Sequence, residues 1–198
     1  MLFGKEGAGK TSTALGLCKW HGGSLVGNDL VQLGYDSGRK KITAQGGTKY
    51  FHLRYESIRR NLPEYLTLFP PMRTDPWLHK VFRMPDELGI PVQTAPTDVS
   101  RSYLIHVDDT LQGLFVRPAD NVVTRLYLNE NLSRYIRGTS IALFGEELAY
   151  LGYVPSLDTE ELFEKRRALI EHLLRNPPMM YVSGPLKDVA EYIKVHSN

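Results

Sequence analysis

Residues 4–11 constrain the fold more strongly than any other part of the sequence. They read Gly-Lys-Glu-Gly-Ala-Gly-Lys-Thr and fit the pattern Gly-x-x-x-x-Gly-Lys-Thr, a loop that cradles phosphate groups between a strand and a helix. Its glycines let the backbone turn tightly and aim N–H groups at phosphate oxygens, and the next helix adds the positive end of its dipole. The apolar residues 1–3 and the helix-forming residues 11–20 supply the flanking strand and helix that the motif requires.

The loop predicts a binding site for a nucleoside triphosphate, ATP or GTP, together with Mg²⁺. Lys10 is expected to reach the β- and γ-phosphates, and the Thr11 hydroxyl is expected to bind the metal ion. The predicted nucleotide-binding residues are Gly4, Lys5, Glu6, Gly7, Ala8, Gly9, Lys10, Thr11 and Ser12.

Composition limits the classes of partner. The 198 residues, 42% of them hydrophobic, predict a single domain over residues 1–198. The 24 basic and 22 acidic side chains leave a net charge of +2, which gives no overall field to recruit nucleic acid or acidic membrane. One cysteine, Cys18, excludes an internal disulfide, and no run is long and apolar enough to span a bilayer. We expect a cytoplasmic protein without nucleic-acid or membrane partners. The sequence leaves open whether the chain forms a homo-oligomer.

The stretch after the first helix carries the next candidate site. Residues 24–27 are predicted to form a short buried strand that delivers Asn28 and Asp29 to its carboxyl end, beside the phosphate loop. An acid there would hold the metal ion or its waters. Asn and Asp also favour turns, so a simple turn is an equally open interpretation.

Residues 36–54 predict a β-rich meander and hence a mixed sheet rather than plain strand–helix alternation. Residues 36–39 have hairpin chemistry, and residues 41–44 and 49–53 are predicted as strands separated by Gly46 and Gly47. Arg54 closes the second of these strands, just before a predicted helix over residues 55–62.

The order of phosphate loop, helix, Leu-Val-Gly-Asn-Asp, hairpin, Gly-Gly and Phe-His-Leu-Arg-Tyr-Glu-Ser-Ile resembles the HPr serine kinase/phosphorylase family and its relative phosphoenolpyruvate carboxykinase. The resemblance covers roughly residues 1–60. It implies an α/β fold, with a mixed β-sheet flanked by helices, and a phosphotransferase activity. The family's two adjacent acids correspond to Asn28 and Asp29, and its metal-binding Glu and nearby Arg correspond to His52 and Arg54. Because Asn28 cannot accept a proton, these departures imply a divergent kinase with another substrate.

Residues 63–100 contain many prolines and are expected to form an insertion that serves as a lid or a wall of the substrate site. Trp77, Leu78, Val81, Phe82 and Met84 are predicted to form a small apolar cluster within it.

Asp108 and Asp109 follow a predicted strand over residues 102–107 and have two interpretations. A strand that ends in two acids resembles a Walker B motif, which binds the metal ion and activates water. The favoured alternative is a hairpin that returns through residues 114–116. A further strand is predicted over residues 122–128, with Arg125 as a second phosphate ligand, and helices are predicted over residues 141–151 and 158–174.

The leading hypothesis is a kinase that moves the γ-phosphate to a hydroxyl group on a small molecule or on a protein serine. Lys10, Asp29 and Arg54 are its predicted catalytic residues, with Thr11 and Asp29 as metal ligands. The alternative is an ATPase or nucleotide switch that uses Asp108 and Asp109, and a non-catalytic nucleotide-binding module is a third possibility.

Overall fold

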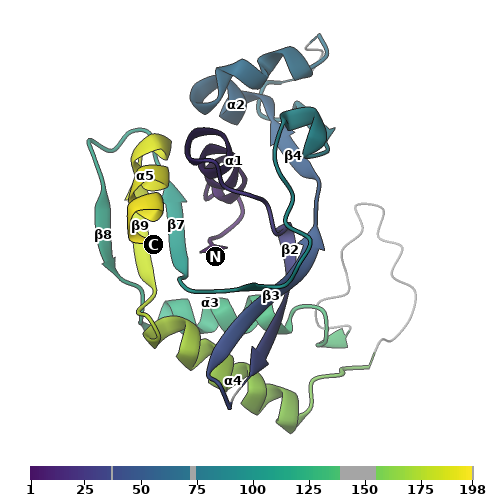
Figure 1. Ribbon diagram of the computed structural model, residues 1–198, viewed down its shortest axis with the longest axis vertical. Helices are drawn as coiled ribbons and strands as arrows, with labels where there is room; N and C mark the ends of the chain where they lie inside the picture. The colour runs from purple at the N-terminus through teal and green to yellow at the C-terminus, as the bar shows by residue number, and fades with distance from the viewer. Residues whose placement is uncertain (37, 72–74, 139–154, 198) are drawn as a thin grey trace. The chain divides into compact units, whose positions relative to one another are not determined.

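The computed structural model describes residues 1–36, 38–71, 75–138 and 155–197 (Figure 1). The chain divides into two compact units. Met1–Pro118 and Met180–Asn198 form the first, here called the sheet unit, and Ala119–Met179 form the second, here called the helical unit.

The sheet unit is built on a four-stranded mixed sheet, as the sequence predicts. Its strand order is β1-β7-β9-β8, with bounds β1 Leu2–Phe3, β7 Tyr103–Val107, β9 Met180–Gly184 and β8 Phe115–Pro118. The first three strands are parallel, and β8 runs antiparallel to β9. β9 therefore separates β7 from β8, so the predicted hairpin after Asp108 and Asp109 is wrong. Sequence spacing could not reveal that a strand some 70 residues later enters between them.

Two helices pack together beside this sheet. Helix α1 (Lys10–His21) follows β1, and helix α5 (Leu186–His196) follows β9. Apolar side chains from β7, from β9 and from both helices meet in one cluster: Tyr103, Ile105, Val182, Val189 and Ile193, with Leu17 packed against them. The strand–helix connections thereby place the start of α1 at the carboxyl edge of the parallel strands.

A three-stranded antiparallel sheet of β2 (Asn28–Asp36), β3 (Lys41–Thr48) and β6 (Thr97–Asp98) also belongs to the sheet unit. The β2–β3 hairpin confirms the predicted turn. Gly46 and Gly47 do not end a strand as predicted, because β3 continues through them. A Cβ at Gly47 would lie 2.0 Å from the carbonyl oxygen of Leu30, so this glycine permits the close approach of β2 at its register shift.

Residues 24–27 differ from the predicted buried strand. Only Leu25 makes a bridge, to Val92, and Asn28 begins β2 instead of ending a strand. Strand β4 (Phe51–Arg54) pairs with β5 (Lys80–Arg83), and helix α2 (Tyr55–Asn61) begins directly after Arg54, as predicted.

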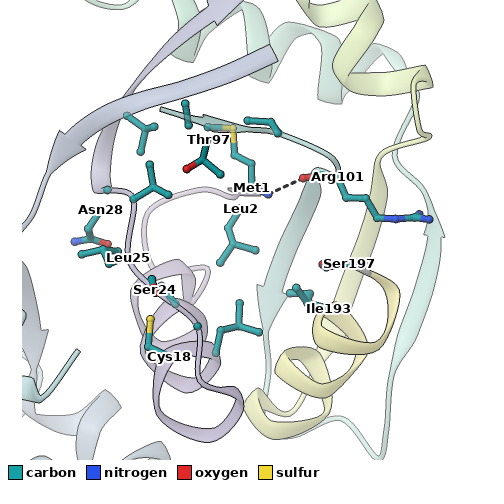
Figure 2. A pocket seen from close by; sticks show the side chains of 18 of the residues that line it. Met1, Leu2, Cys18, Ser24, Leu25, Asn28, Thr97, Arg101, Ile193 and Ser197 are labelled. Atoms are coloured by element: carbon teal, nitrogen blue, oxygen red, sulfur yellow. Dashed lines mark hydrogen bonds between the residues drawn. The ribbon is translucent and has the colours of Figure 1, made fainter. Parts of the chain in front are cut away.

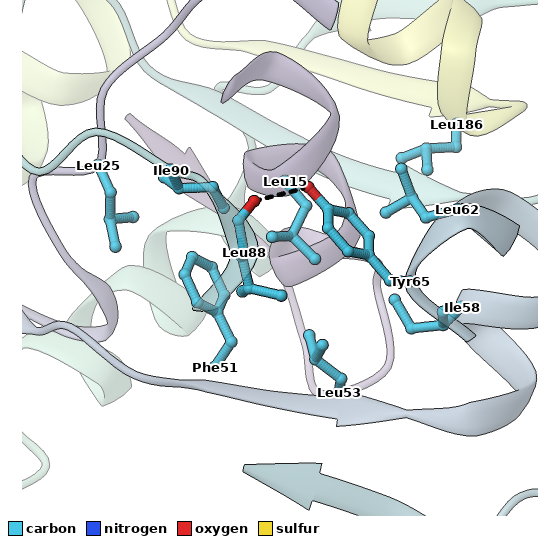
Figure 3. Close-up of a cluster of buried hydrophobic side chains, with 10 residues drawn as sticks. All are labelled: Leu15, Leu25, Phe51, Leu53, Ile58, Leu62, Tyr65, Leu88, Ile90 and Leu186. Carbon is cyan, nitrogen blue, oxygen red and sulfur yellow. Dashed lines mark hydrogen bonds between the residues drawn. The ribbon is translucent and has the colours of Figure 1, made fainter. Parts of the chain in front are cut away.

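The proline-rich segment contributes to the main core. Tyr65, Leu88 and Ile90 are buried there, and the Tyr65 hydroxyl donates to the Leu88 carbonyl oxygen at 3.2 Å (Figure 3). Short 3-10 helices, Pro63–Leu68 and Asp86–Leu88, carry two of them. The remaining buried members of the cluster come from α1, the segment before β2, β4, α2 and the start of α5: Leu15, Leu25, Phe51, Leu53, Ile58, Leu62 and Leu186.

The apolar cluster predicted within residues 77–84 is wrong in most of its members. Trp77, Leu78, Phe82 and Met84 are exposed, and only Val81 packs against the core. Because β4 and β5 form a sheet of two strands, one face packs inward and the other stays outside.

The helical unit contains α3 (Val122–Ser133) and α4 (Glu160–Arg175). The strand predicted over residues 122–128 is wrong. Its β-branched residues suggested a strand, but the Asn121 side chain accepts from the Thr124 backbone N–H at 3.0 Å and caps a helix. The helix predicted over residues 141–151 lies outside the described residues. Within the described ranges, no helix is long and apolar enough to cross a membrane.

Candidate functional site

The phosphate-loop sequence forms a tight connection between β1 and α1. Gly7 and Gly9 adopt left-handed backbone conformations, with φ of 78° and 86°. Gly9 is the N-cap residue of α1, and its carbonyl oxygen accepts from the Thr13 N–H at 2.8 Å. Lys5, Glu6 and Gly7 are exposed at the turn, while Gly4 and Ala8 are buried beneath it.

This loop rests on the carboxyl end of β7. The Val107 N–H donates to the Ala8 carbonyl oxygen at 2.9 Å. A Cβ added to Gly9 would lie 2.4 Å from Val107 Cγ2, and one added to Gly4 would lie 2.9 Å from the Ile105 carbonyl oxygen. Glycine is therefore needed at Gly9 for two reasons, its backbone angle and the contact with β7.

Lys10 folds back over the loop that precedes it. Its ammonium donates to the carbonyl oxygens of Gly4 at 2.7 Å and Lys5 at 3.0 Å. Burial lowers the pKa of Lys10 from its usual 10.5, while the charges of Asp29 and Glu6 act to raise it. An ammonium has three donors, and these two bonds use two of them.

Asn28 and Asp29 lie beside the first turn of α1. The Thr11 hydroxyl is 3.5 Å from Asn28 Oδ1, and the Asn28 amide donates to the Tyr50 carbonyl oxygen at 3.0 Å. Asn28 is 6% exposed, so it is a fixed wall of the site. Asp29 is exposed and adopts a left-handed φ of 56°, at the point where β2 departs from regular pairing.

Mg²⁺ takes oxygen ligands, usually one or two carboxylates together with waters and phosphates. Thr11 and Asn28 bring a hydroxyl and an amide oxygen within 3.5 Å of each other, and Asp29 carries the carboxylate next in the chain. Among the described residues, no group of three or more His, Cys, Asp or Glu side chains is arranged to hold a metal ion.

Asp108 and Asp109 follow β7 directly, one strand away from the phosphate loop. Asp108 accepts from the Thr110 N–H at 3.0 Å and from its hydroxyl at 2.6 Å, and these bonds lower the pKa of Asp108. Asp109 Oδ1 accepts from the Leu186 N–H at 3.4 Å, at the start of α5. The parallel pairing of β1 with β7 brings both acids to the loop's edge of the sheet.

The other predicted residues lie apart from this group. His52 is exposed on β4, where its ring stacks on Tyr50 at 5.3 Å and lies 5.7 Å from Phe82. Arg54 is half-buried at the junction of β4 and α2. No hydrogen bond or ion pair in the described part of the chain joins His52 or Arg54 to the phosphate loop. The roles of His52 and Arg54 in the site therefore stay predictions.

Arg125 belongs to the helical unit, on α3. Its guanidinium pairs with Asp120 at 2.7 Å and with Glu171, and these carboxylates raise its pKa. It is thus already engaged with two acids inside its own unit.

A cavity of about 560 Å³ is lined by Lys10, Asn28 and Asp29 and by further residues of α1. Figure 2 shows Cys18 of α1 and Asn28 among the side chains around it. A volume of this size is typical of pockets for small molecules. The sequence did not predict it, because its walls come from α1, β2 and residues 97–101, which are far apart in the chain. The available signal was the small residues Ala14 and Cys18, spaced four and eight residues after Lys10.

Comparisons with protein-family models, with curated proteins and with solved structures gave no significant match.

Proposed function

We propose that the chain binds a nucleoside triphosphate at residues 4–12 and transfers its γ-phosphate to a hydroxyl acceptor. The observation that carries this proposal is a cavity lined by both Lys10, the last but two of the loop's residues, and Asp29. A nucleotide switch needs only the loop, whereas a kinase also needs room for an acceptor next to the γ-phosphate.

The proposed reaction is a single displacement at phosphorus. Asp29 accepts the proton of the acceptor hydroxyl, the acceptor oxygen forms a bond to the γ-phosphorus, and the bond to the β–γ bridging oxygen breaks. The nucleoside diphosphate leaves with that electron pair. Lys10 and the loop N–H groups stabilise the phosphate charge, and bound Mg²⁺ would supply further charge neutralisation near Thr11.

A specific observation also favours a second candidate, nucleotide hydrolysis with Asp108 and Asp109. Strand β7 lies parallel to β1, and its last residue bonds to the loop through Ala8. Asp108 and Asp109 follow this residue directly, and a carboxylate there can orient a water molecule in place of an acceptor hydroxyl.

Matched substitutions separate the two candidates. Asp29→Asn removes the proton acceptor but keeps a residue type that tolerates the left-handed backbone, which alanine would strain. For the kinase we expect Asp29→Asn to abolish transfer from γ-labelled ATP while fluorescent-ATP affinity persists, and Asp109→Asn to leave transfer largely intact. The reverse pattern, with phosphate released to water, supports hydrolysis. Asp36→Asn, on the exposed β2–β3 turn, is the control.

Lys10→Ala tests the step that both candidates share. Because the ammonium faces the loop, its removal should weaken fluorescent-ATP binding at least about tenfold, or 1.4 kcal/mol. Unchanged affinity in Lys10→Ala would overturn nucleotide binding by the loop and both candidates with it.

A further inference from the structure

The cavity follows one face of α1. Lys10, Ala14, Leu17, Cys18 and His21 all line it, at helical spacings of three and four residues. At about 1.5 Å per residue, this face extends roughly 16 Å away from the phosphate loop. Any molecule that fills the cavity thus has one end at Lys10 and its body along the helix.

The lining of the cavity is largely apolar. Besides the α1 face, it includes apolar side chains from the segment before β2, from β2 and β3, and from the segment before β7: Leu25, Val26, Val31, Ala44 and Val99. Leu2 of the edge strand β1 and Ile193 of α5 add to this lining (Figure 2). Burying an apolar body here would be favourable by about 25 cal/mol for each Å² removed from water.

Three polar side chains of the lining that are farther from the loop contact other residues. Ser197 Oγ lies 3.2 Å from the Tyr103 hydroxyl, His21 Nε2 lies 3.5 Å from a Glu191 oxygen, and Asp98 pairs with Lys41 at 2.8 Å. The Arg101 guanidinium points away from the cavity (Figure 2). By contrast, Asp29 accepts no hydrogen bond from any described residue, so a ligand hydroxyl finds its acceptor at the loop end.

We propose that the phosphate acceptor is a primary alcohol with an apolar body, bound along α1 with its hydroxyl between Lys10 and Asp29. This inference rests on the proposed kinase function and names the class of its acceptor. A small polar alcohol would leave the apolar side chains of the lining in contact with water. A serine side chain on a folded protein would not reach along a face of this length.

Cys18 gives a direct test, because it is the single cysteine of the chain and lines the cavity. Thiol labelling of the full chain is followed at alkaline pH, since burial raises the pKa of Cys18. Geraniol and octanol are the apolar probes, and glycerol is the polar control. We expect geraniol to slow labelling about tenfold or more and glycerol to leave it unchanged.

Two cavity-filling variants on opposite walls locate the bound alcohol. Ala14→Phe and Thr97→Phe should raise the geraniol Kd, measured by calorimetry, about tenfold or more while fluorescent-ATP affinity stays within about twofold. Ala168→Phe, on an exposed position of α4, is the matched control. Circular dichroism confirms that each variant folds.

The outcomes distinguish this inference from the proposed function. Labelling that geraniol leaves unchanged, in protein that binds fluorescent ATP, overturns the apolar acceptor and leaves the kinase intact. Protection of Cys18 in protein that binds no nucleotide overturns phosphate transfer, and with it the role of the alcohol as acceptor. Protection together with labelled geranyl phosphate, formed from γ-labelled ATP, supports both.

Discussion

Gly7 and Gly9 share a left-handed backbone, yet their surroundings differ. No atom lies within 4 Å of a Cβ built on Gly7, whereas one on Gly9 meets two atoms of Val107 at 2.4 and 2.6 Å. A side chain at either position would therefore strain the backbone, but only one at Gly9 would also clash with a neighbour. Substitutions at the two glycines thus distinguish the backbone conformation that the loop requires from its contact with β7.

Gly7→Ala should cost about 1–2 kcal/mol of unfolding free energy, the usual penalty for a side chain in this conformation. Gly9→Ala should cost more, because Val107 must also move, and it should weaken fluorescent-ATP binding further. Urea unfolding and nucleotide titration measure both effects. Adding Val107→Gly to Gly9→Ala removes both close atoms, Val107 Cγ2 and Cβ, and should relieve the clash but not the strain. Equal costs at the two glycines would contradict the close contact with β7.

The titration of Lys10 sets an alkaline limit to nucleotide binding. The charged ammonium is the form that binds phosphate, and burial lowers its pKa, so affinity should fall with rising pH earlier than for an exposed lysine. The Asp29 charge acts to raise this pKa. Asp29→Asn should therefore shift the fall to lower pH, as followed by fluorescent-ATP titration across the alkaline range. An unchanged midpoint would show that Asp29 and Lys10 do not interact.

At the level of elements, local signals were sufficient where one short segment determines the structure. The phosphate-loop pattern and the residues after it predicted α1, and helix α2 begins after Arg54 as expected. The strand predicted over residues 122–128 is wrong, because the Asn121 side chain caps a helix there and this cap outweighs the strand preference of the β-branched residues. Which strands neighbour β7, and which segments enclose the cavity, depend on contacts between distant residues, such as the pairing of Tyr103 with Met180. A single sequence carries little information on such contacts.

Helix α2 depends on a carboxylate that two arginines hold. Glu56 accepts from Arg59 at 2.8 and 2.9 Å and from Arg60 at 2.6 Å, and these hydrogen bonds lower the pKa of Glu56 to about 2. A depressed carboxyl pKa stabilises the fold above the ordinary value of 4.5, and this stability is lost as pH falls from 4.5 toward 2.

Glu56→Gln should thus lower the melting temperature at neutral pH and flatten its dependence on pH between 4.5 and 2. Thermal unfolding followed by circular dichroism at several pH values measures the effect. Glu64→Gln, on the exposed surface of the following 3-10 helix, is the control. An unchanged pH profile in Glu56→Gln would mean that the arginine contacts contribute nothing to stability.

For the whole molecule, the two compact units each contain their own buried apolar residues. Leu15 is fully buried in the sheet unit, where it packs with Phe51 and Leu53, and Leu174 is 1% exposed in the helical unit, on α4.

Leu15→Ala and Leu174→Ala should each destabilise the unit that contains them by about 2–5 kcal/mol. Hydrogen exchange read by mass spectrometry should then show faster exchange in α1 and β4 for the first variant and in α3 and α4 for the second. Because the phosphate loop and the cavity lie wholly in the sheet unit, Leu174→Ala should also leave fluorescent-ATP affinity within about twofold of the parent. Equal acceleration of exchange in both units by either variant would show instead that the chain unfolds as one cooperative body.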